Sequence, residues 1–103
     1  AEALLAERPD ITALFCYNDL VAVGALRTCT RLGMQVPQRI AIAGFDDITI
    51  AALVNPPLTT CRVPRYDIGV QANRLLLNQI NSEPCNGCET ILPVELVVRA
   101  SAP

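Results

Sequence analysis

The chain has 103 residues, of which 51% are hydrophobic and 17% charged, and its ten acidic and eight basic residues leave a formal net charge of −2. This composition is typical of a globular chain that forms one domain or part of one. The net charge would not attract a phosphate backbone, so we expect that this chain alone does not bind DNA. No apolar run approaches the roughly 20 residues that span a bilayer, and no signal-peptide pattern opens the chain. We therefore expect a soluble protein.

The first third of the chain predicts a helix, a strand and a second helix. Residues 1–7 have the composition of a helix interior and contain no initiator Met, so we expect them to lie within a longer protein. The apolar run 11–17 predicts a buried strand. Asn18 and Asp19 are favoured N-cap residues for a helix over 20–32, which Gly33 ends.

Further strands and helices follow in alternation. Residues 40–45 form another continuous apolar run, which is typical of a parallel strand covered on both faces. We expect a short helix over 48–54, a strand over 58–63 and a helix over 64–80 with Pro64 in its first turn. After a polar loop at 81–89, the alternation of Ile91, Val94, Leu96 and Val98 predicts one bent strand or two short strands around Pro93. The pattern favours an α/β fold with a parallel sheet.

Polar residues follow two of the predicted strands directly: Asn18 and Asp19 after the first, Asp46 and Asp47 after the second. The carboxyl ends of neighbouring parallel strands meet at one edge of a sheet, where such folds bind their ligands. An amide and a carboxylate at that edge can hydrogen-bond the vicinal hydroxyls of a polyol. The alternative is structural, since Asn18 and Asp46 can each cap the helix that follows.

Other chemistries find less support in the sequence. The Asp46-Asp47 pair resembles the magnesium pocket of receiver domains, but that pocket also needs a Lys, and all eight basic residues are Arg. Cys85 and Cys88 form a single CxxC, and a structural zinc site would need two further ligands in a chain without His. Without a His, a Lys or a Gly-rich phosphate loop, we expect neither an enzyme nor a cofactor or metal. Five cysteines, an odd number, indicate reduced thiols and hence the cytoplasm.

Two predicted helices carry apolar positions with two interpretations. Val23 and Leu26 belong to the helix after Asn18, and Ala52 and Val54 to the short helix after Asp47. These four residues either pack in the core or form a surface for a partner.

Six strings of residues, taken together in order and spacing, resemble the lactose-repressor/galactose-repressor (LacI/GalR) family of bacterial transcription regulators and cover nearly the whole chain. They are LFCYND at 14–19, VGAL at 23–26, VP at 36–37, AGFDD at 43–47, PPLTT at 56–60 and VELVVR at 94–99.

The resemblance implies a type I periplasmic-binding-protein-like fold, a three-layer α/β sandwich in which two subdomains flank an effector cleft. Residues 1–61 and 96–103 match the C-terminal subdomain, and 64–93 match elements that cross to the N-terminal subdomain. The family's DNA-binding domain and the opposite wall of the cleft would lie in sequence before Ala1. Where the family often has a Gln in a crossover strand, this chain has Val63, so the identity of the sugar stays open.

Functional residues follow from the same resemblance. Asn18 and Asp46 match residues that hydrogen-bond the effector, and Tyr17 and Phe45 match their neighbours at the same strand ends. Val23, Leu26, Ala52 and Val54 match positions near the family's dimer interface. The implied function is a sugar-binding and dimerising module of a regulator that binds operator DNA through its missing domain. One alternative is a sugar-binding protein of an uptake system, which would be exported and monomeric; a second is a metal-dependent receiver or hydrolase that uses Asp46 and Asp47.

Overall fold

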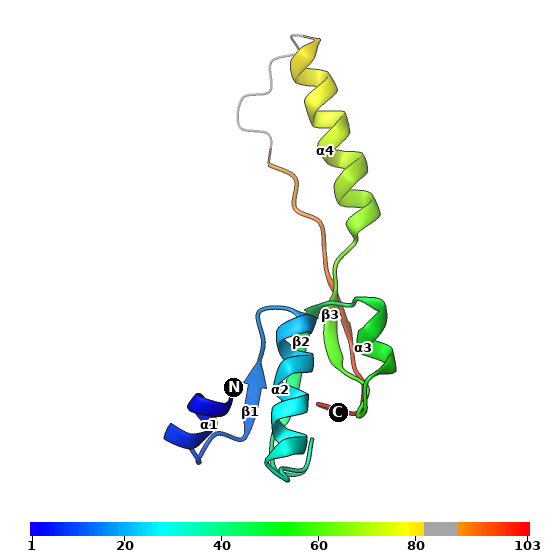
Figure 1. Ribbon diagram of the computed structural model, residues 1–103. Coiled ribbons are helices and arrows are strands. Elements are labelled where there is room, and N and C mark those ends of the chain that lie inside the picture. The colour runs from blue at the N-terminus through cyan, green and yellow to red at the C-terminus, as the bar shows by residue number, and fades with distance from the viewer. Residues whose placement is uncertain (82–88) are drawn as a thin grey trace. The chain divides into compact units, whose positions relative to one another are not determined.

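Four strands form one sheet in the computed structural model, which describes residues 1–81 and 89–103. The strands are β1 (Ala13–Phe15), β2 (Ala41–Asp46), β3 (Thr59–Arg62) and β4 (Glu95–Val97), and they lie side by side in that order (Figure 1). β1, β2 and β3 run parallel, whereas β4 pairs with β3 antiparallel, with Arg62 opposite Glu95. The predicted α/β fold is confirmed, and the parallel part of the sheet gains one antiparallel edge strand.

The helices are α1 (Glu2–Glu7), α2 (Asp19–Arg31), α3 (Thr49–Leu53) and α4 (Arg65–Ile80). Their bounds agree with the expected helices to within a few residues. Gly33 has a φ of +67°, the left-handed conformation that glycine adopts most readily after a helix end. The C-terminal region has one short strand, β4, after Pro93 and no strand in residues 89–94, so neither the predicted bent strand nor the predicted pair of short strands is found. None of these four helices is long and apolar enough to cross a membrane.

The chain divides into two compact units. The first comprises Ala1–Arg62 and Glu95–Pro103, and the second comprises Val63–Val94. The first unit contains the sheet, α1, α2 and α3, and α2 packs against β2. All buried apolar residues of the described chain belong to this unit: Leu5, Cys16, Ala22, Ala25, Leu26, Cys29, Ile40, Ile42, Ala51 and Leu58. Whether the second unit belongs to another subdomain of a longer protein stays a prediction.

The C-terminal segment of the first unit is fastened to the sheet by a buried serine. Ser101 donates a hydrogen bond of 2.6 Å from Oγ to the Ile42 carbonyl, and the same Oγ accepts one of 2.8 Å from the Thr59 N–H. Thr59 Oγ1 in turn lies within 2.9 Å of the carbonyl oxygens of Arg99 and Ala102. These bonds link the last residues of the chain to both β2 and β3.

Candidate functional site: a hollow at the strand ends

A hollow of about 430 Å3 lies at the carboxyl ends of β1 and β2. Its lining consists of Phe15, Tyr17, Asn18, Phe45 and Asp46. The structure therefore brings all four predicted effector-binding residues together around one space. Phe15 was not among them, although its place at the end of an apolar strand beside Tyr17 was a usable signal.

Aromatic rings make up much of this lining. Tyr17 is 88% exposed and Phe15 is 70% exposed. Large aromatic side chains usually bury much of their surface, so two exposed rings side by side are unusual. Small-molecule sites are commonly lined by aromatic side chains with a few polar groups among them, as this hollow is.

Asn18 takes part in two features at once. Its Oδ1 accepts a hydrogen bond of 2.9 Å from the Val21 N–H, so the residue caps α2 as one of the sequence interpretations expected. The cap uses the amide oxygen, and the amide nitrogen has two N–H donors of its own. Capping α2 is thus compatible with donating hydrogen bonds into the hollow.

Asp46 sits at the end of β2 in an unusual backbone conformation. Its φ is +113° and that of Asp47 is +52°, a region that residues other than glycine rarely adopt. The N-cap of α3 is Ile48, so Asp46 does not occupy the capping position that the structural interpretation gave it.

Asp19 belongs to the interior of the protein and not to the hollow. It is fully buried, accepts a hydrogen bond of 2.5 Å from Thr60 Oγ1, and accepts another of 2.8 Å from the Ile48 N–H. These bonds tie the start of α2 to β3 and to the start of α3. The approach is close enough that a Cβ at Gly44 would collide with Asp19 Oδ1.

Asp47 is held by two arginines. Its carboxylate oxygens lie 2.7 Å from Arg99 Nη2 and 2.7 Å from Arg62 Nε, and Arg62 Nη1 also lies 3.1 Å from Glu95 Oε2. Burial raises the pKa of the Asp47 carboxyl, but its bonds and charge interactions with Arg99 and Arg62 outweigh burial and hold that pKa below its ordinary value. This network was not predicted from the sequence.

The four predicted interface residues have different surroundings. Leu26 is only 4% exposed and belongs to the core, so it offers almost no surface to a second copy. Val54 packs against the same core, Val23 is half-buried, and Ala52 is exposed. The outward sides of α2 and α3 carry other exposed apolar residues, namely Leu20, Val21, Ile50 and Leu53.

No group of three or more His, Cys, Asp or Glu side chains with the arrangement of a metal site occurs in residues 1–81 and 89–103. Cys16, Cys29 and Cys61 are free thiols. Burial raises the pKa of the Cys16 and Cys29 thiols, which therefore favour the protonated form. Cys85 and Cys88, the CxxC pair for which the sequence gave little support as a zinc site, lie outside the described residues.

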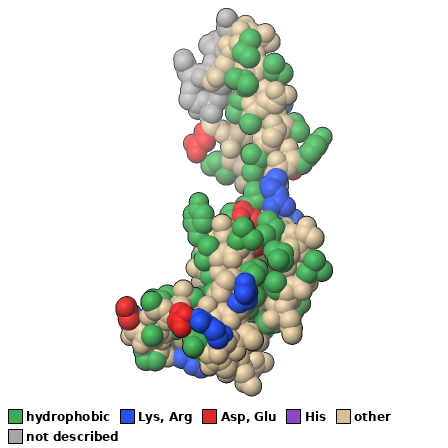
Figure 2. Space-filling view, viewed as in Figure 1, with side chains coloured by type: hydrophobic (Ala, Val, Ile, Leu, Met, Phe, Trp, Pro, Cys, Tyr) green, Lys and Arg blue, Asp and Glu red, His purple; other side chains and the backbone are tan. Residues whose placement is uncertain are grey.

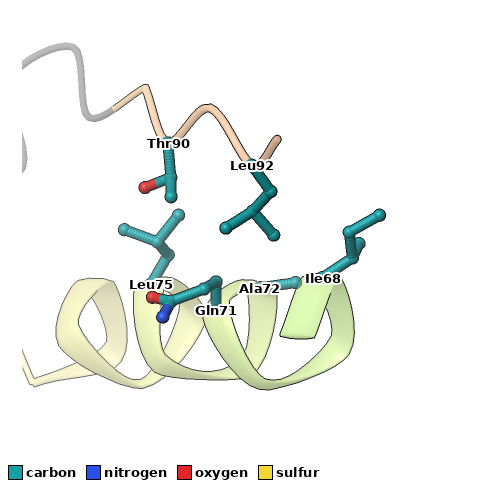
Figure 3. Close-up of a pocket in the computed structure, with 6 residues that line it drawn as sticks. All are labelled: Ile68, Gln71, Ala72, Leu75, Thr90 and Leu92. Carbon is teal, nitrogen blue, oxygen red and sulfur yellow. The ribbon is translucent and has the colours of Figure 1, made fainter. Parts of the chain in front are cut away.

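The second unit has a hollow of its own, of about 290 Å3. In Figure 3, Thr90 and Leu92 of the segment opposite α4 point toward the helix, and Leu75 of α4 points toward that segment. The lining is Ile68, Gln71, Ala72, Leu75, Thr90 and Leu92. It contains no charged group, so it lacks the combination of charge and aromatic surface found at the strand ends.

Comparison with known proteins gives a consistent result. The family model for periplasmic binding protein-like domains matches residues 1–102. The HTH-type transcriptional repressor CytR of Escherichia coli is 41% identical over 90 residues, which are 87% of this chain and 26% of the repressor.

Two solved structures are similar to the chain in both sequence and fold. The transcription regulator GntR from Chromobacterium violaceum has a TM-score of 0.86 at 49% identity, covering 97% of this chain and 37% of that one. The transcriptional regulator CelR in complex with cellobiose has a TM-score of 0.91 at 35% identity, covering 96% of this chain and 30% of that one. The chain thus spans between about a quarter and two fifths of the length of these three proteins. It belongs to the family of periplasmic binding protein-like domains, and it is similar over nearly its whole length to the members of that family found in LacI-family transcription regulators.

Proposed function

We propose that the chain is the C-terminal part of the effector-binding domain of a LacI-type transcription regulator, and that a small carbohydrate or related metabolite binds at the strand-end hollow. The observation that supports this most directly is the gathering of Tyr17, Asn18, Phe45 and Asp46 around one space. The cellobiose complex of the similar regulator CelR supports a saccharide as the class of ligand.

The chemistry of the hollow suits a polyol. The Asp46 carboxylate accepts hydrogen bonds from hydroxyl groups, and the Asn18 amide nitrogen donates them. The rings of Phe15 and Tyr17 offer an apolar surface to the C–H faces of a sugar ring. A hydrogen bond from a hydroxyl group to the Asp46 carboxylate is charge-assisted and therefore roughly twice as strong as a neutral one.

In this proposal the effector acts by binding one of two states of the regulator more tightly than the other. A ligand can shift such an equilibrium only by the difference between its affinities for the two states. The DNA-binding domain is expected in sequence before Ala1, and residues 64–93 are expected to belong to the N-terminal subdomain. We expect the protein to act in the cytoplasm, where such a regulator binds its DNA.

We further propose that the regulator is a homodimer through the outward sides of α2 and α3. Val23 and Ala52 retain the interface role that the resemblance implies, and the exposed side chains of Leu20, Val21, Ile50 and Leu53 extend that surface. Exposed apolar residues on two neighbouring helices are common in homodimer interfaces. Leu53→Glu should lower the dimer fraction in analytical ultracentrifugation of the full-length protein, whereas Asp10→Asn, in an exposed ion pair outside both helices, serves as the control.

The effector proposal is tested in the full-length protein that contains this chain. Fluorescence anisotropy of labelled operator DNA reports binding, and a panel of mono- and disaccharides that includes cellobiose identifies one that changes it. Asp46→Asn removes the carboxylate charge while Asn tolerates the positive φ. We expect the saccharide response to move to at least about tenfold higher concentration, the usual effect of losing a charged hydrogen bond, with DNA affinity unchanged in the absence of saccharide.

Asp10→Asn is the matched control, since Asp10 forms an exposed ion pair with Arg8 away from the hollow. A response that Asp46→Asn leaves unaltered would show that the hollow is not the effector site. If the upstream reading frame encodes an export signal in place of a helix-turn-helix, the protein is an uptake component and not a regulator.

A further inference from the structure

The turn that carries Asp46 is held in a conformation that its own residues disfavour. Asp46 and Asp47 both have positive φ, and neither is glycine. Such backbones persist only where the surrounding structure fixes them, and they occur often at ligand sites. Contacts with the surrounding residues must therefore fix this turn.

The contacts on Asp47 are the strongest candidates. Its side chain is 9% exposed and forms ion pairs of 2.7 Å with both Arg99 and Arg62. Arg99 is itself anchored, because its Nη1 donates to the Leu58 carbonyl at 2.8 Å and its N–H donates to Thr59 Oγ1 at 2.7 Å. The Asp47 carboxylate is therefore bound by Arg99, which hydrogen bonds hold in place, as well as by the half-exposed Arg62.

The backbone on either side of Asp47 has support of its own, since Asp46 at the end of β2 lies opposite Arg62 of β3. The Asp47 N–H lies 3.4 Å from Thr60 Oγ1, which is long for a hydrogen bond. The next residue, Ile48, donates its N–H to the buried Asp19 at 2.8 Å. β3 thus supports the chain before the turn and Asp19 supports the chain after it, while the two arginines hold the Asp47 side chain between them.

We propose that Asp47 is a positioning residue for the effector site: its clamp by Arg99 and Arg62 holds Asp46 in the left-handed conformation that directs it to the hollow. This inference rests on the proposed function for its purpose, because Asp46 is there assigned to the effector. The geometric part, that the clamp sets the backbone of Asp46, stands independently of any ligand.

The geometric part is tested by crystal structures of the full-length protein and two variants. Asp47→Gly removes the clamp while glycine accepts the φ of +52° without strain. Asp47→Asn keeps a side chain of the same shape without the charge, and serves if the glycine variant does not fold. We expect φ of residue 46 to leave the positive region in the glycine variant. A residue 46 that stays near +113° without the clamp overturns the proposal.

The functional part is tested by calorimetric titration with the saccharide that binds the wild type. We expect Asp47→Gly to weaken saccharide binding about tenfold, the effect of misplacing one charged hydrogen bond. Asp47→Glu, which retains a carboxylate for the arginines, should recover part of that loss. Loss of fold stability without a change in saccharide affinity would mean a merely structural role and would overturn the assignment.

Glu95→Gln supplies the matched control, because it removes the negative charge of the other partner of Arg62 and leaves both bonds of Asp47 in place. We expect it to change neither φ of residue 46 nor the affinity. If the wild type binds no saccharide, the proposed function fails, and φ of residue 46 in the variants still decides whether Asp47 sets the turn.

Discussion

The two units of the chain bury apolar surface to very different extents. The first unit contains every buried apolar residue of the described chain, including the fully buried Ile40, Ile42 and Leu58. In the second unit, α4 has no buried residue at all. Figure 2 shows hydrophobic side chains on the surface of α4, and Leu76, Leu77 and Ile80 are among those exposed.

This difference indicates that the two units obtain their stability from different contacts. Burying apolar surface contributes about 25 cal/mol per Å2, and α4 obtains little of that stabilisation from the described chain. The first unit can be stabilised by its own core, whereas α4 needs a partner surface. In the proposed regulator, that surface belongs to the N-terminal subdomain.

The largest contrast is expected from truncating one side chain in each unit. Ile42→Ala removes a fully buried side chain and should lower the free energy of unfolding by about 2–5 kcal/mol. Leu76→Ala removes a 55% exposed side chain and should change it by less than about 0.5 kcal/mol. Urea denaturation of the 103-residue chain, followed by circular dichroism, measures both. Equal losses would contradict the assignment of the core to the first unit.

Replacing a glycine by alanine should change the free energy of unfolding in opposite directions in the two units. Gly44→Ala places a Cβ against Asp19 and Leu58, so we expect a loss of about 1–3 kcal/mol. Gly69 of α4 has nothing within 4 Å of the same position, and Gly69→Ala should stabilise the helix by about 0.5–1 kcal/mol. Thermal unfolding of both variants decides the matter. Destabilisation by Gly69→Ala would show that α4 is more closely packed than described.

The N-terminal caps of α2 and α4 also differ. Asn18 caps α2 through its side chain, whereas Pro64 at the start of α4 makes no such bond. We expect Asn18→Ala to cost about 1 kcal/mol and Asn18→Ser, which can still accept from the Val21 N–H, to cost much less. Both variants lose the amide, so saccharide titration separates the ligand role from the cap. A serine variant as unstable as the alanine variant would argue against the cap.

The smallest effect concerns pH and is confined to the first unit. The folded pKa of Asp47 is lowered, so its stabilising contribution is fully present above the unfolded pKa of about 4 and is lost as the pH falls through the folded pKa. The free-energy difference between wild type and Asp47→Asn should therefore shrink as the pH is lowered from 7 toward 2 in urea titrations. A difference that stays constant over that range would mean that the arginines do not stabilise the carboxylate.

Local patterns predicted the elements well, because apolar runs, N-caps and helix-ending glycines act over a few neighbouring residues. The hollow was also foreseeable, since parallel strands place their carboxyl ends together and Asn18 and Asp46 each follow such a strand. Partners that lie far apart in sequence could not be predicted from these local patterns. Asp47 is bound by Arg62 and Arg99, which lie 15 and 52 residues away in sequence, and nothing near Asp47 identifies them.

The burial of single residues was equally hidden from sequence patterns. Asp19 looked like a second polar group for the site, but it is fully buried and bonded to Thr60. Leu26 looked suitable for an interface or a core, and helical periodicity alone does not say which side of α2 faces the sheet. Only the packing of α2 against β2 distinguishes these possibilities.

The central claim is that a saccharide binds at the strand-end hollow of the first unit. Hydrogen–deuterium exchange of the full-length protein, with and without the saccharide found in the operator assay, tests it most directly. We expect slower exchange in peptides that contain Tyr17 and Asn18 and in those that contain Phe45 and Asp46, and loss of this protection in Asp46→Asn. Unchanged exchange at both strand ends under saturating saccharide would contradict it.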